Sequence, residues 1–205
     1  MSPPAHLLPH LECRFFDQSD AGFWEKVEPV HLRETETAKV PQQATWFKMA
    51  WTENELRVLF YAEDSLAWAT LTEHDEPLYN EEVVEVFLDP VGDLECYFEI
   101  EVNQLNTVCD LVLRRTRSGY RKDFGWHCEG LQTSVTKTPE FWMVEMTIPF
   151  SSMESGPPLA GEKWRANFFR IDRPKNASSE LSAWSPTGLP LFHVQEKFGF
   201  LEFVR

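Results

Sequence analysis

The residues best placed to do chemistry in this sequence lie in the run LYNEEVVEVFLDP, residues 78–90. Side chains alternate along a strand, so the apolar residues at positions 84, 86 and 88 share one face, and Glu85 and Phe87 lie on the other. A wholly apolar face packs against a core, which leaves a carboxylate and a ring on the back of the strand. Carboxylates accept hydrogen bonds from hydroxyl groups, and aromatic rings pack on the apolar faces of a pyranose.

The run CYFEIEVN, residues 96–103, follows a turn at Pro90–Asp93 and is predicted to pair with the first run. If Leu88 faces Cys96, then Glu99, Glu101 and Asn103 continue the polar row beside Glu85. Three carboxylates on neighbouring strands repel one another and cost stability unless they have partners. Such a row would suit a sugar-binding floor, because carboxylates and amides together bind pairs of hydroxyl groups.

Two interpretations of this acidic row remain open at this point. A solvent-exposed outer face would be neutralised by neighbouring arginines, for which the candidates are Arg114, Arg115 and Arg170. A sugar-binding face would use rings from adjacent loops, for which the candidates are Tyr79, Phe192 and Trp184. The turn-forming residues that follow Trp184 in AWSPTG also suit a ring that anchors the loop by packing.

Length and composition predict one domain with an aromatic-rich core. The chain has 205 residues, of which 42% are hydrophobic and 14% aromatic. Short apolar runs alternate with turn-forming residues and no long run has a helical period, which predicts an all-β fold, a β-sandwich of about nine mainly antiparallel strands. An irregular lead-in over residues 1–13 would precede a sandwich domain over residues 14–205. The strands are expected near residues 44–50, 55–62, 83–88, 95–102, 108–114, 131–136, 141–149, 164–171 and 198–204.

The charge and the cysteines narrow the class of protein. A formal net charge of −14 repels phosphate backbones and anionic lipids, so neither nucleic acid nor a membrane is an expected partner. The four cysteines form no CxxC pair and predict no zinc or redox centre. No signal peptide is evident, which predicts a cytoplasmic protein as written, or an extracellular or periplasmic one if a leader was removed. The acidic composition is compatible with structural calcium, although no EF-hand pattern is present and no cofactor is required.

Seven runs in order resemble carbohydrate-binding module family 9, in the broader family-9-like group. They span about Trp46 to Phe203 and read AWTENELRVLFYAED, LYNEEVVEVFLDP, YFEIEVNQLNTV, FWMVEMTIPFSSM, WRANFFRID, AWSPTG and FHVQEKFGFLEF. The resemblance implies a β-sandwich that binds a saccharide without transforming it. It also implies a link to polysaccharide or oligosaccharide breakdown, with a glycoside hydrolase as a partner. It also implies calcium ions that stiffen some of the loops.

The resemblance also implies a set of site residues. Two tryptophans hold the terminal sugar in this family, and their positions fall on Tyr79 and Phe192. The acidic partner falls on Glu85 and the amide on Asn103, while the family's arginine before the amide is replaced by Glu101.

That replacement turns a donor of several hydrogen bonds into an acceptor. Arg170 would supply the missing positive group if its strand lies beside the cleft, and His193 would close one side.

Three rival functions follow from the same residues. A glycosidase would use Glu85 with Glu99 or Glu101 as its two carboxyls, but a flat sheet face gives no evident means of keeping one of them protonated. A haem-binding sandwich would need ligands from Met49, Met143 or Met146 and from His74, His127 or His193. The third rival is a protein-interaction module that has lost the sugar site.

Overall fold

The computed structural model describes residues 8–17, 20, 22–176 and 178–205, and the structural statements below concern those residues. The strands are β1 (His10–Phe15), β2 (Val30–His31), β3 (Arg33–Glu34), β4 (Thr45–Trp51), β5 (Glu55–Glu63), β6 (Val83–Asp89), β7 (Cys96–Asn103), β8 (Val108–Thr116), β9 (Gly119–Asp123), β10 (Gln132–Lys137), β11 (Phe141–Pro149), β12 (Lys163–Asp172), β13 (Glu180–Ala183) and β14 (Gly199–Val204). Single 3-10 turns are η2 (Phe23–Lys26), η3 (Leu78–Asn80), η4 (Phe150–Ser152) and η5 (Gln195–Lys197). No helix among these residues is long and apolar enough to cross a membrane.

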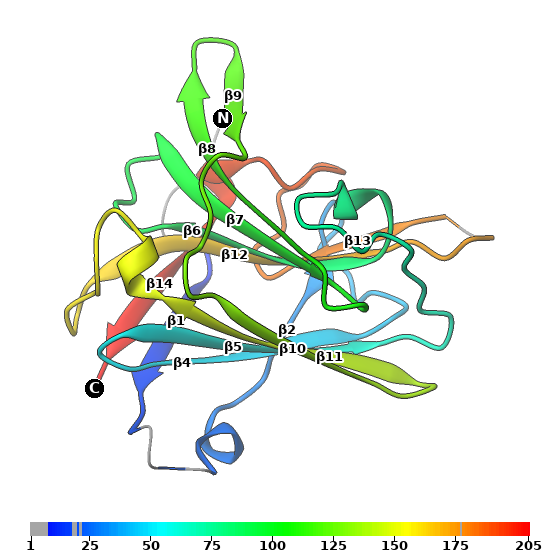
Figure 1. Ribbon diagram of the computed structural model, residues 1–205, viewed down its shortest axis with the longest axis horizontal. Helices are drawn as coiled ribbons and strands as arrows, with labels where there is room; N and C mark the ends of the chain where they lie inside the picture. Colours follow the sequence, from blue (N-terminus) through cyan, green and yellow to red (C-terminus); the bar gives the residue numbers. More distant parts are fainter. Residues whose placement is uncertain (1–7, 18–19, 21, 177) are drawn as a thin grey trace.

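The strands form one sheet that folds back on itself into two layers (Figure 1). Its order is β10-β11-β5-β4-β1-β14-β12-β6-β7-β8-β9. Strand β1 pairs in parallel with both β4 and β14 and so connects the layer of β4, β5, β10 and β11 to the layer of β6, β7, β8 and β12. Apart from these two contacts of β1, the paired strands are antiparallel. The predicted β-sandwich is confirmed.

The core between the layers is built from residues that alternate along each strand. Strand β5 buries every second side chain, and β11 does the same opposite it. Large rings fill the space between the layers, as the composition predicts: Phe47 stacks on Phe168 with ring centroids 4.1 Å apart, and Trp164 meets Phe203 edge to face at 4.8 Å.

The register of β6 against β7 differs from the expected one by two residues. Leu88 pairs with Phe98 and not with Cys96, and Glu85 pairs with Glu101. The connection is longer than a tight hairpin because the Asp89 carboxylate accepts the backbone N–H groups of Gly92, at 2.7 Å, and Leu94, at 3.2 Å. A slip of two residues keeps every side chain on its own face, so the predicted facing sets are unchanged.

Several strands were not expected from the sequence. They are β1, β2, β3, β9 and β13, which are short, polar or at the edge of the sheet, so they lack a run of apolar alternation. Of the predicted irregular lead-in over residues 1–13, residues 1–7 lie outside the described part of the chain, and residues 10–13 belong to β1.

The outer face of the β6–β7 layer is buried as well. Every residue of β6 is buried, including those on the face that carries the acidic row. A second hydrophobic cluster covers this face, made of Leu78, Val83, Phe87, Tyr97, Cys109, Leu111, Leu113, Phe169, Ile171, Ala183, Phe192 and Phe198. It brings residues of the segments before β6 and after β12 onto the sheet. The alternative of a solvent-exposed outer face is therefore wrong.

Trp184 lies in the main core, where it packs on Phe47 and Phe168. Its ring leaves no room for a side chain at Gly199, because a Cβ atom there would lie 2.5 Å from the indole and 2.8 Å from the carbonyl oxygen of Pro9. The ring thus fixes where β14 enters the sheet.

Gly199→Ala is expected to lower the free energy of unfolding by about 1–3 kcal/mol, because the added methyl group overpacks a rigid site. Urea denaturation measures this change. Gly22→Ala is the matched control, since the nearest atoms to its new methyl group lie 3.9 Å away. Equal losses in both variants would contradict the packing role of Trp184.

Candidate functional site

A cavity of about 400 Å³ opens over the outer face of β6 and β7, beside the second cluster. It is lined by Tyr79, Glu85, Glu99, Lys122, Ile171, Arg173, Leu181, Pro190, Leu191, Phe192 and His193. Five of the nine site residues expected from the sequence are among them: Tyr79, Glu85, Glu99, Phe192 and His193. The cavity is called the β6 pocket below.

Buried carboxyls form the floor of the β6 pocket. Glu85 and Glu99 are each 2% exposed, and Glu101, which pairs with Glu85 across the strands, is 1% exposed behind them. Burial, followed by the charges of the neighbouring glutamates, raises the pKa of Glu85 and of Glu101 well above the usual range. Glu101 hydrogen bonds to Glu99, which favours a proton on Glu101 and the charge on Glu99.

The burial of these carboxyls provides a means of keeping one of them protonated, which a flat sheet face would lack. The row does not lie on a flat, exposed sheet face, because the second cluster and the covering loops bury it. Desolvation and like charge are sufficient to keep a carboxyl protonated. The protonation of these carboxyls therefore does not distinguish a catalytic site from a binding site.

Lys122 of β9 is the cation that faces the acidic row. It pairs in register with Leu113, which pairs with Tyr97, so alternation places Lys122 on the same face as Glu99. Its charge opposes the rise in the pKa of Glu85, Glu99 and Glu101. Its Nζ atom also lies 5.2 Å from the ring centroid of Tyr79.

The arginines expected to neutralise the row pair elsewhere. Arg114 contacts Glu154 at 2.7 Å, and Arg115 contacts Glu196 at 2.7 Å. Lys122 was missed because β9 has no apolar pattern that would identify it as a strand.

Two rings line the β6 pocket from separate segments. Tyr79 belongs to η3 and is 42% exposed, so much of its ring is open to a ligand. Phe192 is 7% exposed and stacks on Phe169, with centroids 4.1 Å apart and planes at 17°. Packing on Phe169 holds the Phe192 ring in place and leaves only part of it facing the cavity.

His193 adds a neutral polar group to the wall. Burial and the nearby charge of Lys122 lower its pKa to about 4, so the imidazole is uncharged at neutral pH. The Tyr97 hydroxyl and His193 Nδ1 form a hydrogen bond of 2.7 Å. His193 therefore adds a polar group without a charge.

Arg170 lies on the other side of the sheet, contrary to expectation. Its strand is beside β6, but Arg170 pairs with Val84 and shares that residue's inward face. The guanidinium, 1% exposed, binds Asp64 at 2.9 Å and the Glu63 carbonyl oxygen at 2.7 Å, and so ties the two layers together. It cannot reach the β6 pocket.

Arg173 is the arginine that lines the β6 pocket. Odd-numbered positions at this end of β12 share the face of Glu85, because Phe169 pairs with Glu85 in register. Arg173 donates to the Tyr79 carbonyl oxygen at 3.3 Å, and its buried Nε has no partner in the described structure. Arg173 is thus the arginine side chain that stands beside the cavity.

Asn103 and Trp184 do not line the β6 pocket. Asn103 is fully buried at the end of β7, where its amide donates to the Leu71 carbonyl oxygen and its side-chain oxygen accepts the N–H groups of Leu105 and Thr107. Its role is to fix the turn into β8. Trp184 is in the main core, as described above.

A second cavity, of about 510 Å³, is larger but differs in character. It is lined by residues of the β3 region and of the segment before β13, including Thr35, Gln42 and Glu180, and no aromatic ring contributes to it. Ring-lined concave surfaces are the usual sites for small organic ligands, so the β6 pocket is the better candidate.

A group of three carboxyls, Asp64, Glu82 and Asp172, bears on the implied calcium. Arg170 contacts Asp64 at 2.9 Å and Asp172 at 3.6 Å, so a cation already stands in this group. Burial, followed by a hydrogen bond to Asp64, raises the pKa of Glu82 to about 8. A calcium ion needs six to eight oxygen ligands and ionised carboxylates, which this arrangement does not provide.

The methionines considered for haem, Met49, Met143 and Met146, lie on β4 and β11, whereas the histidines lie in loop segments. Met49 and Met146 are buried in the main core, His193 lines the β6 pocket, and His74 and His127 lie beside β8. Met at such positions fills core space.

A two-layer β-sandwich with one ring-lined, polar pocket on its outer face defines a small ligand-binding module. The sequence matches the family described as carbohydrate family 9 binding domain-like over residues 17–204, and the chain belongs to that family. A comparison with curated protein sequences gives no significant match.

Solved structures share the fold at low identity. A candidate carbohydrate-binding protein from Bacteroides uniformis ATCC 8492 superposes with a TM-score of 0.76 and 19% identity, over 95% of this chain and 98% of that one. A family 9 module from Caldicellulosiruptor kristjanssonii in complex with cellotriose gives 0.73 and 19%, over 96% and 94%. The same organism's family 9 module in complex with glucose gives 0.69 and 18%, over 96% and 97%.

Glu101→Gln tests the buried proton. The pKa of Glu101 is raised from its ordinary value of 4.5, so the folded chain holds a proton that the unfolded chain releases, and stability is lost as the pH rises above that value. A glutamine at this position can still donate a hydrogen bond, but its amide does not ionise as the pH rises. Relative to wild type, its free energy of unfolding should rise by on the order of 1 kcal/mol at pH 8 and change little at pH 5.

Urea titrations at the two pH values give the comparison, with exposed Glu28→Gln as the control. Glu82 adds to the fall in wild-type stability up to about pH 8, so the variant's curve is flatter but not flat. A pH dependence of the Glu101 variant identical to wild type would show that Glu101 is ionised in the folded state.

Proposed function

We propose that this chain binds a terminal sugar of an oligosaccharide or polysaccharide in the β6 pocket and does not transform it. The observation that carries the proposal is that Tyr79, Phe192 and Glu85 line one cavity. The two rings come from segments that are 113 positions apart in the sequence. Membership of a family of carbohydrate-binding domains supports it. A volume of about 400 Å³ accommodates one pyranose with its bound water.

The pocket offers complementary groups to a sugar ring. The open face of Tyr79 and the edge of Phe192 provide apolar surface for its C–H groups. The Glu99 carboxyl can accept hydrogen bonds from hydroxyl groups, while Glu85, whose pKa burial raises well above its ordinary value, can donate to one hydroxyl and accept from another. Pairing of donors and acceptors with adjacent hydroxyls fixes the orientation of the ring.

Positive groups on the rim compensate for the departure at Glu101. Arg173 and Lys122 both line the pocket, where their side chains can meet a sugar hydroxyl or an acidic substituent. This chain therefore does not reproduce the donor pattern implied by its family, and its preferred sugar differs accordingly. The cellotriose and glucose bound by the Caldicellulosiruptor module are starting ligands for a screen.

Binding is favoured over hydrolysis for two reasons. Glu101 lies behind the floor and does not line the β6 pocket, so it does not contact a glycosidic bond held there. The remaining pair, Glu85 and Glu99, sits on the floor on one side of a bound ring, whereas a glycosidase places its two carboxyls on opposite sides of the bond. With this binding we propose a role beside a glycoside hydrolase in saccharide breakdown, as the family resemblance implies.

The wild-type chain is expected to bind at least one saccharide of a panel that includes glucose, cellotriose and uronic-acid oligomers, with a Kd of about micromolar to millimolar. Tyr79→Ala should weaken binding about tenfold through the loss of ring stacking. Glu85→Ala should weaken it by at least as much, because a ligand hydroxyl loses its partner. Glycan-array screening followed by calorimetry measures both changes.

Phe124→Ala is the matched control for Tyr79, because Phe124 is also 42% exposed and does not line the pocket. Circular dichroism verifies that each variant is folded. The proposal fails if no saccharide in the panel binds, or if the Tyr79 and Glu85 variants bind like the control. Release of shorter saccharides by wild type, and not by the Glu85 variant, would establish a hydrolase instead.

A further inference from the structure

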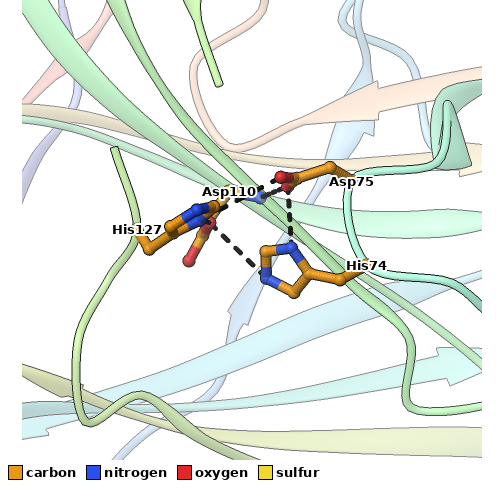
Figure 2. Close-up of side chains that lie close together, drawn as sticks. All are labelled: His74, Asp75, Asp110 and His127. Atoms are coloured by element: carbon orange, nitrogen blue, oxygen red, sulfur yellow. Dashed lines mark hydrogen bonds and ion pairs between the residues drawn. The ribbon is translucent and has the colours of Figure 1, made fainter. Parts of the chain in front are cut away.

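Four potential metal ligands converge at the edge of β8, away from the β6 pocket (Figure 2). They are His74 and Asp75 from the loop before η3, Asp110 of β8 and His127 from the segment after β9. One ligand atom from each residue lies within 4.8 Å of all the others. This group is called the His–Asp cluster below.

The fold leaves the edge of β8 open to these loops. Strand β9 pairs with β8 only from Val112 onward, so residues 108–111 lack a strand partner on that side. The Asp75 segment takes its place: its N–H donates to the Val108 carbonyl oxygen at 3.1 Å, and its Oδ1 accepts the N–H of Asp110 at 3.2 Å. His127 follows β9 as the chain turns away from the sheet.

Backbone hydrogen bonds orient both carboxylates. Asp110 Oδ2 accepts the N–H of Cys128 at 2.8 Å, and Asp75 Oδ1 accepts the N–H of Asp110. Each carboxylate thus has one oxygen committed to the backbone and presents the other, Asp110 Oδ1 and Asp75 Oδ2, to the histidines. Such outer contacts are typical of ligating carboxylates.

Each imidazole directs one ring nitrogen toward the carboxylate oxygens of Asp75 and Asp110. His127 Nδ1 lies 3.2 Å from Asp110 Oδ1 and 4.0 Å from Asp75 Oδ2. His74 Nε2 lies 3.6 Å from Asp110 Oδ1, while its Nδ1 is 3.1 Å from Asp75 Oδ1, a contact that fixes the tautomer. Ligand atoms about 2.0–2.1 Å from a tetrahedral metal are roughly 3.3 Å apart, close to these separations.

The charge of Asp110 supports a cation at this position. Its side chain is 3% exposed, and within the described part of the chain its ion-pair partners are only His74 and His127. A buried carboxylate without a permanent cation costs stability. As metal ligands, two carboxylates and two imidazoles together carry a charge of −2, which a divalent ion balances.

We propose that the His–Asp cluster binds one divalent transition-metal ion of the zinc type. Two imidazole nitrogens and two carboxylate oxygens suit zinc, whereas calcium takes oxygen ligands alone and needs more of them. The ion joins the loop before η3 and the segment after β9 to the open edge of β8. The site is independent of the sugar proposal, because its residues do not line the β6 pocket.

The test is calorimetric titration of zinc chloride into the full chain after removal of metals with a chelator. One zinc ion per chain is expected, with affinity lowered at least about a hundredfold in His127→Ala and in His74→Ala, since loss of a ligand costs more than loss of an outer contact. Both histidines are about half exposed, 57% and 49%, so these variants keep the fold. Zinc should also raise the Tm of the wild type and not of the variants.

His31→Ala is the matched control, an exposed histidine elsewhere on the surface, and it should bind zinc like the wild type. Calcium chloride is titrated under the same conditions. Zinc binding of equal strength in the wild type and both cluster variants overturns the proposal, as does the lack of saturable zinc binding. Calcium binding that survives the histidine variants and excludes zinc would overturn it as well.

Discussion

Burial of both faces of β6 is the constraint on which the rest of the structure depends. One face belongs to the core between the layers, and the other, which carries Glu85, lies under a second hydrophobic cluster. Burying a glutamate in this way is unfavourable unless it keeps a proton or gains partners. The segments that cover the face therefore stop short of closing it, and the opening that they leave is the β6 pocket.

The partners of the acidic row come from the strands that follow it. Glu101 hydrogen bonds to Glu99, and among the described residues Lys122 is the lysine that lines the pocket. Arg170 meets the corresponding need on the inner face, where it neutralises Asp64 and joins the two layers. Lys122 on the pocket side and Arg170 on the core side each compensate the carboxylates of their own face of the sheet. The pocket can therefore keep buried carboxyls at its base without weakening the core.

Sequence reasoning predicted the parts of this structure that depend on alternation. The facing sets of β6 and β7 and the sandwich fold came from period-two patterns and from the family resemblance. The register did not, because the turn is set by hydrogen bonds to the Asp89 side chain that the pattern does not reveal. Strands without apolar alternation, such as β9, were missed for the same reason, and Lys122 with them.

The choice of arginine shows the same limit. Arg170 was expected to supply the positive group if its strand lay beside the cleft. That strand does lie beside β6, but the position of Arg170 faces inward, while Arg173, three residues later, lines the pocket. Alternation counted from the Phe169–Glu85 pair would have identified it, had the pairing of β6 with β12 been known. The His–Asp cluster could not be predicted from the sequence either. Its ligands come from the loop before η3, from β8 and from the segment after β9, and they meet only in the folded chain.

A crystal structure of the chain with a saccharide from the panel tests the central claim most directly. The account predicts one sugar ring in the β6 pocket, against Tyr79 and Phe192, with its hydroxyls bound by Glu85 and Glu99. A sugar bound instead in the larger cavity beside β3, with the β6 pocket filled only by water, would contradict it.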